Sequence, residues 1–175
     1  MKKFFLLVCI PVFSISRAQD NPFTFNEVVK VDSVERATLY NRAKRWIDSS
    51  YASAQSVIQT DDSINKIIVV KAAFIVHVSD GFVRDGGNVR YTLSIQCKDG
   101  RYKITLADFI HHHGSSDLGD GGDLNKTKPS CSPLDLPKYY WHQIKEQATE
   151  HRDHLISSIK SALGFNRMLI QNNDW

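Results

Sequence analysis

The alternation of apolar and polar residues in the middle of the chain predicts a β-sheet with one buried face. From Ile68 to Val78 every even position is apolar, whereas the odd positions admit the polar residues Lys71 and His77. Successive side chains of a strand point to opposite faces, so this segment presents one core face and one mixed face. The apolar set comprises Ile68, Val70, Ala72, Phe74, Val76 and Val78.

The following segments alternate more strictly and predict a hairpin. One strongly alternating segment precedes the dipeptide Asp99-Gly100 and another follows it. This dipeptide is a strong signal for a two-residue turn, because both central residues of such a turn adopt positive φ. With that loop, Cys97 lies opposite Tyr102, and apolar residues face each other in register. The predicted core face comprises Val89, Tyr91, Leu93, Ile95 and Cys97, then Tyr102, Ile104 and Leu106.

Two other segments repeat apolar residues at helical spacing and predict amphipathic helices. The first runs from about residue 32 to residue 50, with Asp32 or Ser33 as the candidate N-cap. The second follows Pro137 and ends near Gly164. Their apolar faces comprise Leu39, Ala43, Trp46 and Ile47 in the first, and Trp141, Ile144, Ala148, Leu155, Ile159 and Ala162 in the second.

The complete element order predicts a single α+β domain. A first strand covers residues 23–31, a short strand precedes the turn at 60–63, and a glycine-containing turn covers residues 79–88. The predicted order is β-α-β-β-β-β-α, a five-stranded antiparallel sheet. Because the helices and the sheet each have one apolar face, we expect both helices to pack on one face of the sheet and the other face to stay open.

Several stretches of this pattern resemble a known family. They are the helix "LYNRAKRWI", the strand-turn-strand "VIQTDDSINKIIVV" and the hairpin "YTLSIQCKDGRYKI". The chain is similar, over about residues 24–109, to a family of exported bacterial domains of unknown function with a TATA-box-binding-protein-like (TBP-like) fold. The resemblance implies that architecture and no catalytic residues, since a fold does not determine a function.

The N-terminus predicts export. Lys2 and Lys3 precede an apolar run of about a dozen residues, which is the pattern of a signal peptide over residues 1–18. A rival interpretation, a lipoprotein signal with Cys9 acylated, leaves too short an apolar region before the cysteine. No later segment approaches the roughly 20 apolar residues of a membrane-spanning helix. We therefore expect a periplasmic or secreted protein without a transmembrane segment.

Removal of the signal peptide changes the charge and the expected partners. Lys2, Lys3 and Arg17 leave with it, so the basic residues fall from 22 to 19 and equal the 19 acidic residues. A mature chain without net charge gives no support to a nucleic-acid partner. We expect one domain over residues 19–165, with a long His, Asp and Gly loop at 110–136 and a tail at 166–175.

The open sheet face is the first candidate for a functional surface. The alternation assigns to it four basic residues and no acid, together with His77. Such a local basic patch could bind an acidic glycan, a peptide or a partner protein of the envelope, whereas the competing interpretation is an ordinary solvated face. The candidate ligand-binding residues are Lys71, His77, Arg90, Arg101 and Lys103.

The segment "HHHGSSDLGDGGD" is the second candidate. Imidazole and carboxylate groups bind transition metals, so His111, His113, Asp117 and Asp120 could form a site with the last helix, for a metal-binding protein or a metal-dependent hydrolase. Neighbouring residues of an extended chain point to opposite sides, which allows at most the first and third histidines to converge. A mobile, solvated loop is the favoured interpretation. The last helix adds His151 and His154.

Other chemistry receives little support. The chain contains no nucleophile elbow, phosphate-binding loop or dinucleotide fingerprint, so we expect a non-enzymatic protein without a cofactor. Cys97 and Cys131 could form a disulfide in an exported protein. The strand pattern points Cys97 into the core, however, which favours a buried thiol.

Overall fold

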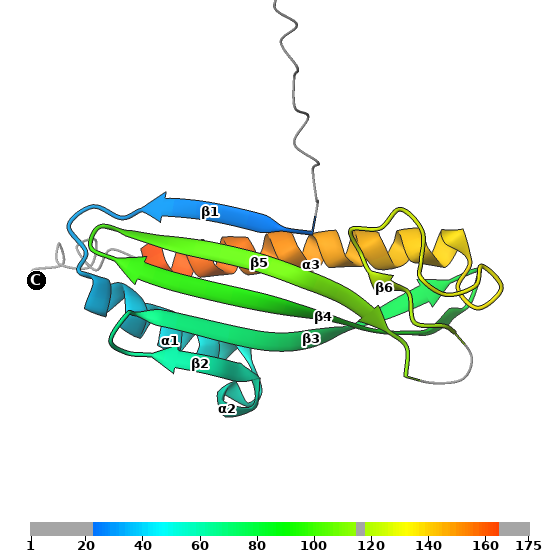
Figure 1. Ribbon diagram of the computed structural model, residues 1–175, viewed down its shortest axis with the longest axis horizontal. Helices are drawn as coiled ribbons and strands as arrows, with labels where there is room; N and C mark the ends of the chain where they lie inside the picture. Colours follow the sequence, from blue (N-terminus) through cyan, green and yellow to red (C-terminus); the bar gives the residue numbers. More distant parts are fainter. Residues whose placement is uncertain (1–22, 115–117, 165–175) are drawn as a thin grey trace, which may run out of the picture.

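The computed structural model describes residues 23–114 and 118–164, and the predicted signal peptide and tail lie outside them. The described chain contains three helices and six strands (Figure 1). Their order is β1 (Phe25–Lys30), α1 (Arg36–Ser50), α2 (Ala54–Val57), β2 (Ile58–Asp62), β3 (Ile67–Ser79), β4 (Val83–Lys98), β5 (Arg101–His112), β6 (Gly122–Asp123) and α3 (Lys138–Gly164).

The strands form one antiparallel sheet in the order β1-β5-β4-β3-β2, and the two-residue β6 pairs with β5. The predicted hairpin register is confirmed, because Cys97 pairs with Tyr102 across the β4–β5 turn. Gly100 in that turn has a φ of 70°, which glycine adopts without strain. The α+β class and the antiparallel sheet are therefore as predicted, with α2 and β6 as additions.

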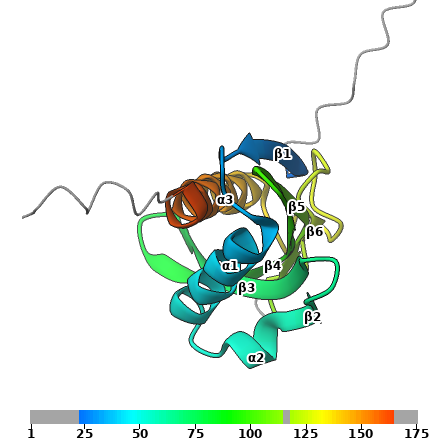
Figure 2. The same cartoon turned by 90° about the vertical axis from the view of Figure 1, so that its left-hand side faces the viewer.

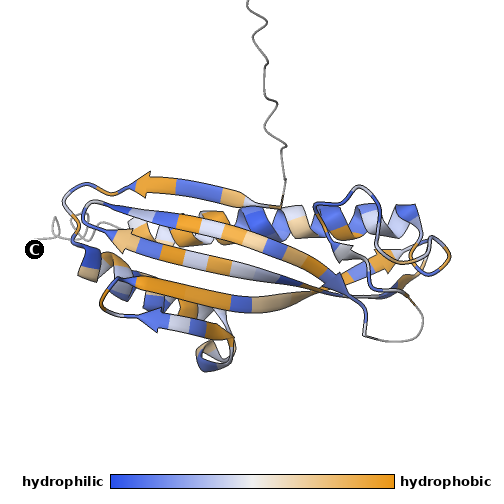
Figure 3. Ribbon diagram, in the orientation of Figure 1, coloured by the Kyte–Doolittle hydropathy of each residue, from blue (hydrophilic) through white to orange (hydrophobic). Residues whose placement is uncertain are grey.

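Both long helices cover the same face of the sheet (Figures 1 and 2). The hydropathy colouring alternates along β4 and β5, as expected for a sheet with one face in the core, whereas β3 is hydrophobic over most of its length (Figure 3). On α1 the predicted apolar residues are all buried, and Tyr40 joins them. The core between sheet and helices includes Trp46, Ile95, Ile104, Leu106, Phe109, Trp141, Ile144 and Ile159.

Helix α1 begins later than the sequence indicates, and neither Asp32 nor Ser33 caps it. The helix starts at Arg36, and Ser33 instead takes a positive φ of 62° in the turn before it. The N–H of Arg36 donates to Oδ1 of Asp99 at 2.8 Å. The first turn of α1 is thus capped by a carboxylate from the β4–β5 turn, 63 residues away in the sequence.

The two long central strands extend beyond their predicted ends. The predicted turn at 79–88 is short, since Ser79 already pairs with Val83, and two buried glycines of β4 form a bulge opposite β3. Likewise, β5 continues to His112 and takes the first two histidines of the predicted loop into the sheet. These extensions determine where the candidate site residues point.

Candidate functional site

The open face of the sheet carries a hollow near its centre, which we call the central hollow. It has a volume of about 510 Å³, and its charged lining comes from three neighbouring strands. Lys71 of β3, Arg90 of β4 and His112 of β5 lie around it, together with Asp108. Lys71 and Arg90 are exposed and stand on the face to which the alternation assigns them.

A bulge in β5 determines the chemistry of this hollow. Thr92 pairs with Ala107 and Arg90 with Ile110, so β5 has one extra residue there, and Asp108 takes a positive φ of 56°. The bulge brings one carboxylate to a face that was predicted to carry no acid. That part of the prediction is wrong, because a bulge leaves no clear signal in the alternation.

A second hollow, the end hollow, lies on the same face close to the β4–β5 turn. It measures about 220 Å³. Lys98 of β4 and Arg101 and Lys103 of β5 are exposed around it. The remaining lining is Val28, Gln96 and Tyr102.

The first strand brings a further cation to the end hollow. Because β1 pairs with β5, Lys30 lies directly opposite Arg101, and Arg101 lies opposite Lys98 on its other side. Lys30 is exposed like its two neighbours. Sequence reasoning missed Lys30, because nothing in the chain indicates that the first strand pairs with the fifth.

His77 differs from the other predicted open-face residues. Its side chain is exposed, but it lies beyond the β4 bulge and lines neither hollow. The backbone N–H of His77 donates to Oε1 of Gln147 at 3.0 Å, and its carbonyl accepts from Nε2 of the same side chain. Gln143 makes the same pair of bonds with Ser79. Helix α3 therefore covers this part of the β3 edge with two amides.

The histidine run is divided between the two faces of the sheet. His112 points to the central hollow, whereas the His111 ring is fully buried on the helix side. Nδ1 of His111 accepts the N–H of Gly121 at 2.9 Å, so its Nε2–H donates to the carbonyl of Gly86 at 2.7 Å. Burial lowers the pKa of His111, partly opposed by the Gly86 hydrogen bond. Its neutral ring holds the segment after β5 against β4.

That segment is packed rather than solvated in its described part. Leu124 and Leu136 are fully buried, and the N–H of Leu124 donates to the carbonyl of Phe109 at 3.0 Å. A Cβ at Gly121 would lie 2.4 Å from the Trp141 ring, so only glycine fits there. The prediction of a solvated loop is wrong for residues 118–124. The glycines of this segment allow its backbone to pack closely against the core.

Asp120 and His113 belong to the same packed arrangement. Asp120 accepts the backbone N–H of His113 at 2.8 Å, and its second oxygen lies 3.3 Å from Nδ1 of His112. The backbone hydrogen bond from His113 is the main reason that the pKa of the Asp120 carboxyl lies below its usual range. His113 is buried, and its Nε2 lies 3.2 Å from the carbonyl oxygen of Asp85.

The predicted metal ligands do not form a coordination site in the described part of the chain. Within residues 23–114 and 118–164, no group of three or more His, Cys, Asp or Glu residues is arranged to hold an ion. Asp117 lies outside the described residues. His151 instead stacks on Phe74 at 3.9 Å between ring centroids, and its pKa is lowered by burial, whereas His154 is exposed.

The two cysteines of the predicted mature chain are free. Cys97 is buried at the β4–β5 turn, where burial raises its thiol pKa to about 12. Cys131, in the segment between β6 and α3, is half-buried and packs against Gly119. The disulfide hypothesis therefore does not hold in this structure, and Cys97 is the buried thiol that the strand pattern favours.

A third hollow, about 710 Å³, lies on the other side of the molecule along α3. Its charges are mixed, with Lys138 and Lys145 set against Glu146 and Glu150. The ammonium group of Lys145 donates to the carbonyl of Lys126 at 2.7 Å. This groove lacks the single sign of charge that distinguishes the end hollow. Within the described residues, no helix has the length and apolar character needed to cross a membrane.

Comparison with known proteins identifies related folds. A family model described as "Domain of unknown function (DUF4468) with TBP-like fold" matches residues 25–112, just over half of the chain. A TBP-like protein from Parabacteroides distasonis is 14% identical, with a TM-score of 0.59 over 80% of this chain and 91% of its own. A DUF4468 family protein from Bacteroides ovatus is 13% identical, with a TM-score of 0.60 over 82% and 86%. No curated protein matches the chain.

Proposed function

Because the chain belongs to the DUF4468 family of TBP-like domains, whose description assigns no activity, we propose a function from the surface itself. The protein is a non-enzymatic binding module of the bacterial cell envelope, and its open sheet face binds a ligand that carries acidic groups. The observation that carries this proposal is the gathering of exposed cations from four strands on one face. These exposed cations are Lys30, Lys71, Arg90, Lys98, Arg101 and Lys103.

The distribution of charge supports an acidic ligand. Of the acids on this face, Asp108 lies at the central hollow. Asp62 is separated from Lys103 by β3 and β4, and its carboxylate accepts bonds from the backbone and side chain of Asn65. Asp85 is a further exposed acid, opposite His77 and outside both hollows. A surface on which cations outnumber acids concentrates negatively charged ligands and speeds their association. Because the mature protein has no net charge, an acidic ligand is attracted to this local patch and not to the protein surface as a whole.

The location is proposed from the N-terminal pattern. Cleavage after residue 18 would release a mature domain outside the cytoplasm, where acidic glycans and envelope proteins are the available partners. N-terminal sequencing of the protein recovered from the producing bacterium tests this. A mature chain that begins at Gln19 supports export, and a chain that retains Met1 in the cytoplasmic fraction contradicts it.

A polyanion titration tests the binding proposal. Heparin serves as the probe for the mature protein, with binding measured by calorimetry at low and at physiological salt. The variant Lys71→Gln/Arg90→Gln/Arg101→Gln should bind at least about tenfold more weakly and with a smaller salt dependence, because each exposed charge-assisted contact contributes a fraction of the affinity.

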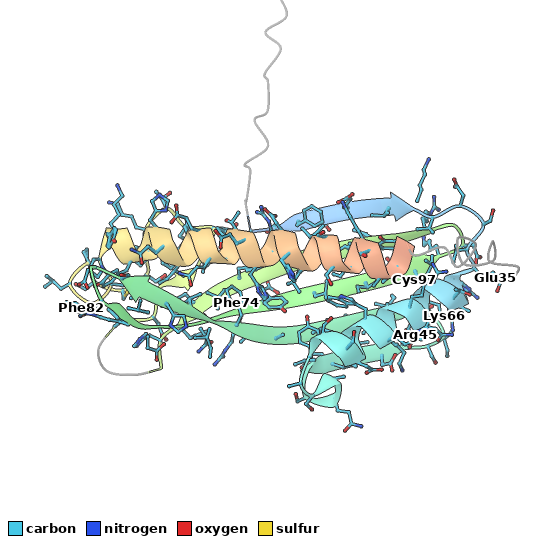
Figure 4. All side chains as sticks on the ribbon, turned by 180° about the vertical axis from the view of Figure 1, so that it is seen from behind. Glu35, Arg45, Lys66, Phe74, Phe82 and Cys97 are labelled. Carbon is cyan, nitrogen blue, oxygen red and sulfur yellow. The ribbon has the colours of Figure 1, made fainter. Side chains whose placement is uncertain are left out.

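The matched control is Arg45→Gln, which removes an exposed cation from α1 on the helix side of the sheet (Figure 4). It should bind heparin like the wild type. Equal binding by the triple variant and the wild type would contradict the proposal, as would an equal loss in the Arg45→Gln control.

A further inference from the structure

Three cations form a straight row across neighbouring strands beside the end hollow. Lys30, Arg101 and Lys98 are direct cross-strand partners on β1, β5 and β4, and we call them the cation row. Adjacent strands lie about 4.8 Å apart, so the row extends over about 10 Å. Lys103 follows on the same face, two residues along β5 from Arg101.

This arrangement is unfavourable for the sheet itself. Like charges placed directly opposite each other destabilise a strand pair, and the cation row contains two such pairs. Within the described parts of the chain, none of these four cations forms an ion pair. The neighbouring acids have other partners, because Asp99 caps α1 and Glu27 pairs with Lys160 at 2.7 Å. Sheet stability therefore does not account for the row.

The size of the end hollow limits what the row can hold. Its volume of about 220 Å³ is below the roughly 300–1,000 Å³ of a site for a whole small-molecule ligand. Gln96 offers an amide at its margin, and Val28 is 56% exposed beside it. A compact polar group fits this hollow, with the rest of the ligand lying across the sheet.

We propose that the cation row and Lys103 bind a phosphate group, as a monoester or diphosphate of a soluble molecule. This inference rests on the proposed function and names the chemical class of its ligand. A phosphate monoester carries about −1.5 to −2 charges at neutral pH, against −1 for a single carboxylate, and so matches several neighbouring cations better. The guanidinium fork of Arg101 suits two phosphate oxygens at once.

The surroundings of the row favour a soluble ligand over a lipid headgroup. Binding to a membrane surface combines cations with a substantial apolar area that enters the lipid interface. Val28 is the one exposed apolar residue that lines the end hollow among the described residues. An end hollow with a single exposed valine in its lining offers little apolar area for insertion.

Titration of the mature protein with pyrophosphate at low salt tests the inference. Calorimetry should detect binding, and Arg101→Gln should weaken it at least about tenfold, as expected for the loss of a charge-assisted bidentate contact. Arg101→Lys keeps the charge but loses the fork, so we expect an intermediate loss. Arg45→Gln is the control and should bind like the wild type. Because Arg101 is exposed, each variant should keep the wild-type circular dichroism spectrum.

Several outcomes would overturn the inference. They are the absence of pyrophosphate binding, undiminished binding by Arg101→Gln, and binding of citrate as tight as that of pyrophosphate. Tighter binding to vesicles of phosphatidylcholine with phosphatidic acid than to pyrophosphate would assign the row to a membrane instead. If heparin binds through the open face while pyrophosphate does not, the phosphate site fails and the proposed function stands. If neither probe binds, both fail.

Discussion

The buried His111 ring offers the sharpest test of the structure. Replacement by leucine keeps an apolar side chain of similar size in contact with the core but removes both ring nitrogens. The carbonyl of Gly86 and the N–H of Gly121 then lose the partners they have at 2.7 and 2.9 Å. Both glycines are buried, so water does not readily replace the ring.

The magnitude follows from these two groups. A buried donor or acceptor left without a partner costs about 1–3 kcal/mol, so two such groups together cost about 2–6 kcal/mol. Partial relaxation of the segment after β5 favours the lower part of that range, and we expect about 3 kcal/mol for His111→Leu. The control is His112→Leu, whose ring is partly exposed on the other face and whose nitrogen lies 3.3 Å from Asp120. It should cost less than about 1 kcal/mol.

Urea unfolding of the mature protein at neutral pH, followed by circular dichroism, measures both free energies of unfolding. Amide hydrogen exchange at Gly121 gives a local reading and should become faster in His111→Leu. A loss below about 1 kcal/mol, or a loss no larger than that of His112→Leu, would refute the assignment of His111 as a buried structural link. Such a result would favour the interpretation of the histidine run as part of a solvated loop.

Three further predictions concern the rest of the fold. Burial holds the pKa of His111 and of His151 below 6.5 in the folded state, so their contribution to stability is complete above pH 6.5 and is lost as the pH falls below that value. Urea unfolding at different pH values should show this loss of stability, and the loss should be smaller in His151→Phe. An unchanged pH dependence of stability in the variant would contradict the prediction. Gly87→Ala should lower the free energy of unfolding by about 2 kcal/mol or more, because Gly87 has a φ of 86° and its new Cβ would lie 2.4 Å from a carbonyl oxygen of β5. Gly81→Ala, at a φ of 113° in open space, should lower it less. Equal losses at the two positions would contradict the predicted clash at Gly87. Arg101→Gln should raise the free energy of unfolding by about 0.2–1 kcal/mol at low salt, because it removes two like-charge cross-strand pairs. The gain should become smaller at high salt. A loss of stability would instead show that the cation row stabilises the sheet.

The candidate site was predictable only where it depends on alternation. Lys71, Arg90, Arg101 and Lys103 lie on the open face, because their strands keep a period of two through these positions. His112 and Asp108 were not assigned to that face, since the bulge at Asp108 shifts the alternation in the second half of β5. Lys30 depends on the pairing of β1 with β5, which connects segments about 70 residues apart and has no local signal.

The histidine run illustrates a similar limit. A glycine-rich polar segment usually forms a solvated loop, and composition alone favours that interpretation. In the structure the segment packs against the core, because Gly121 lets the backbone approach the Trp141 ring closely. The N–H of Gly121 also comes close enough to His111 to donate a hydrogen bond to its ring. Glycine permits both outcomes, and the surrounding side chains decide between them.

The amino-acid sequence by itself determined the elements and their local relations: the hairpin register at Asp99-Gly100, the apolar faces of both long helices, and the α+β class. These follow from periods of 2 and 3.6 residues and from a turn that few residues can adopt. Tertiary structure alone decided that α1 is capped by Asp99, that His111 is buried and neutral, and that three cations meet across β1, β5 and β4. Each of these depends on partners far apart in the chain, which only the packing of the sheet brings together.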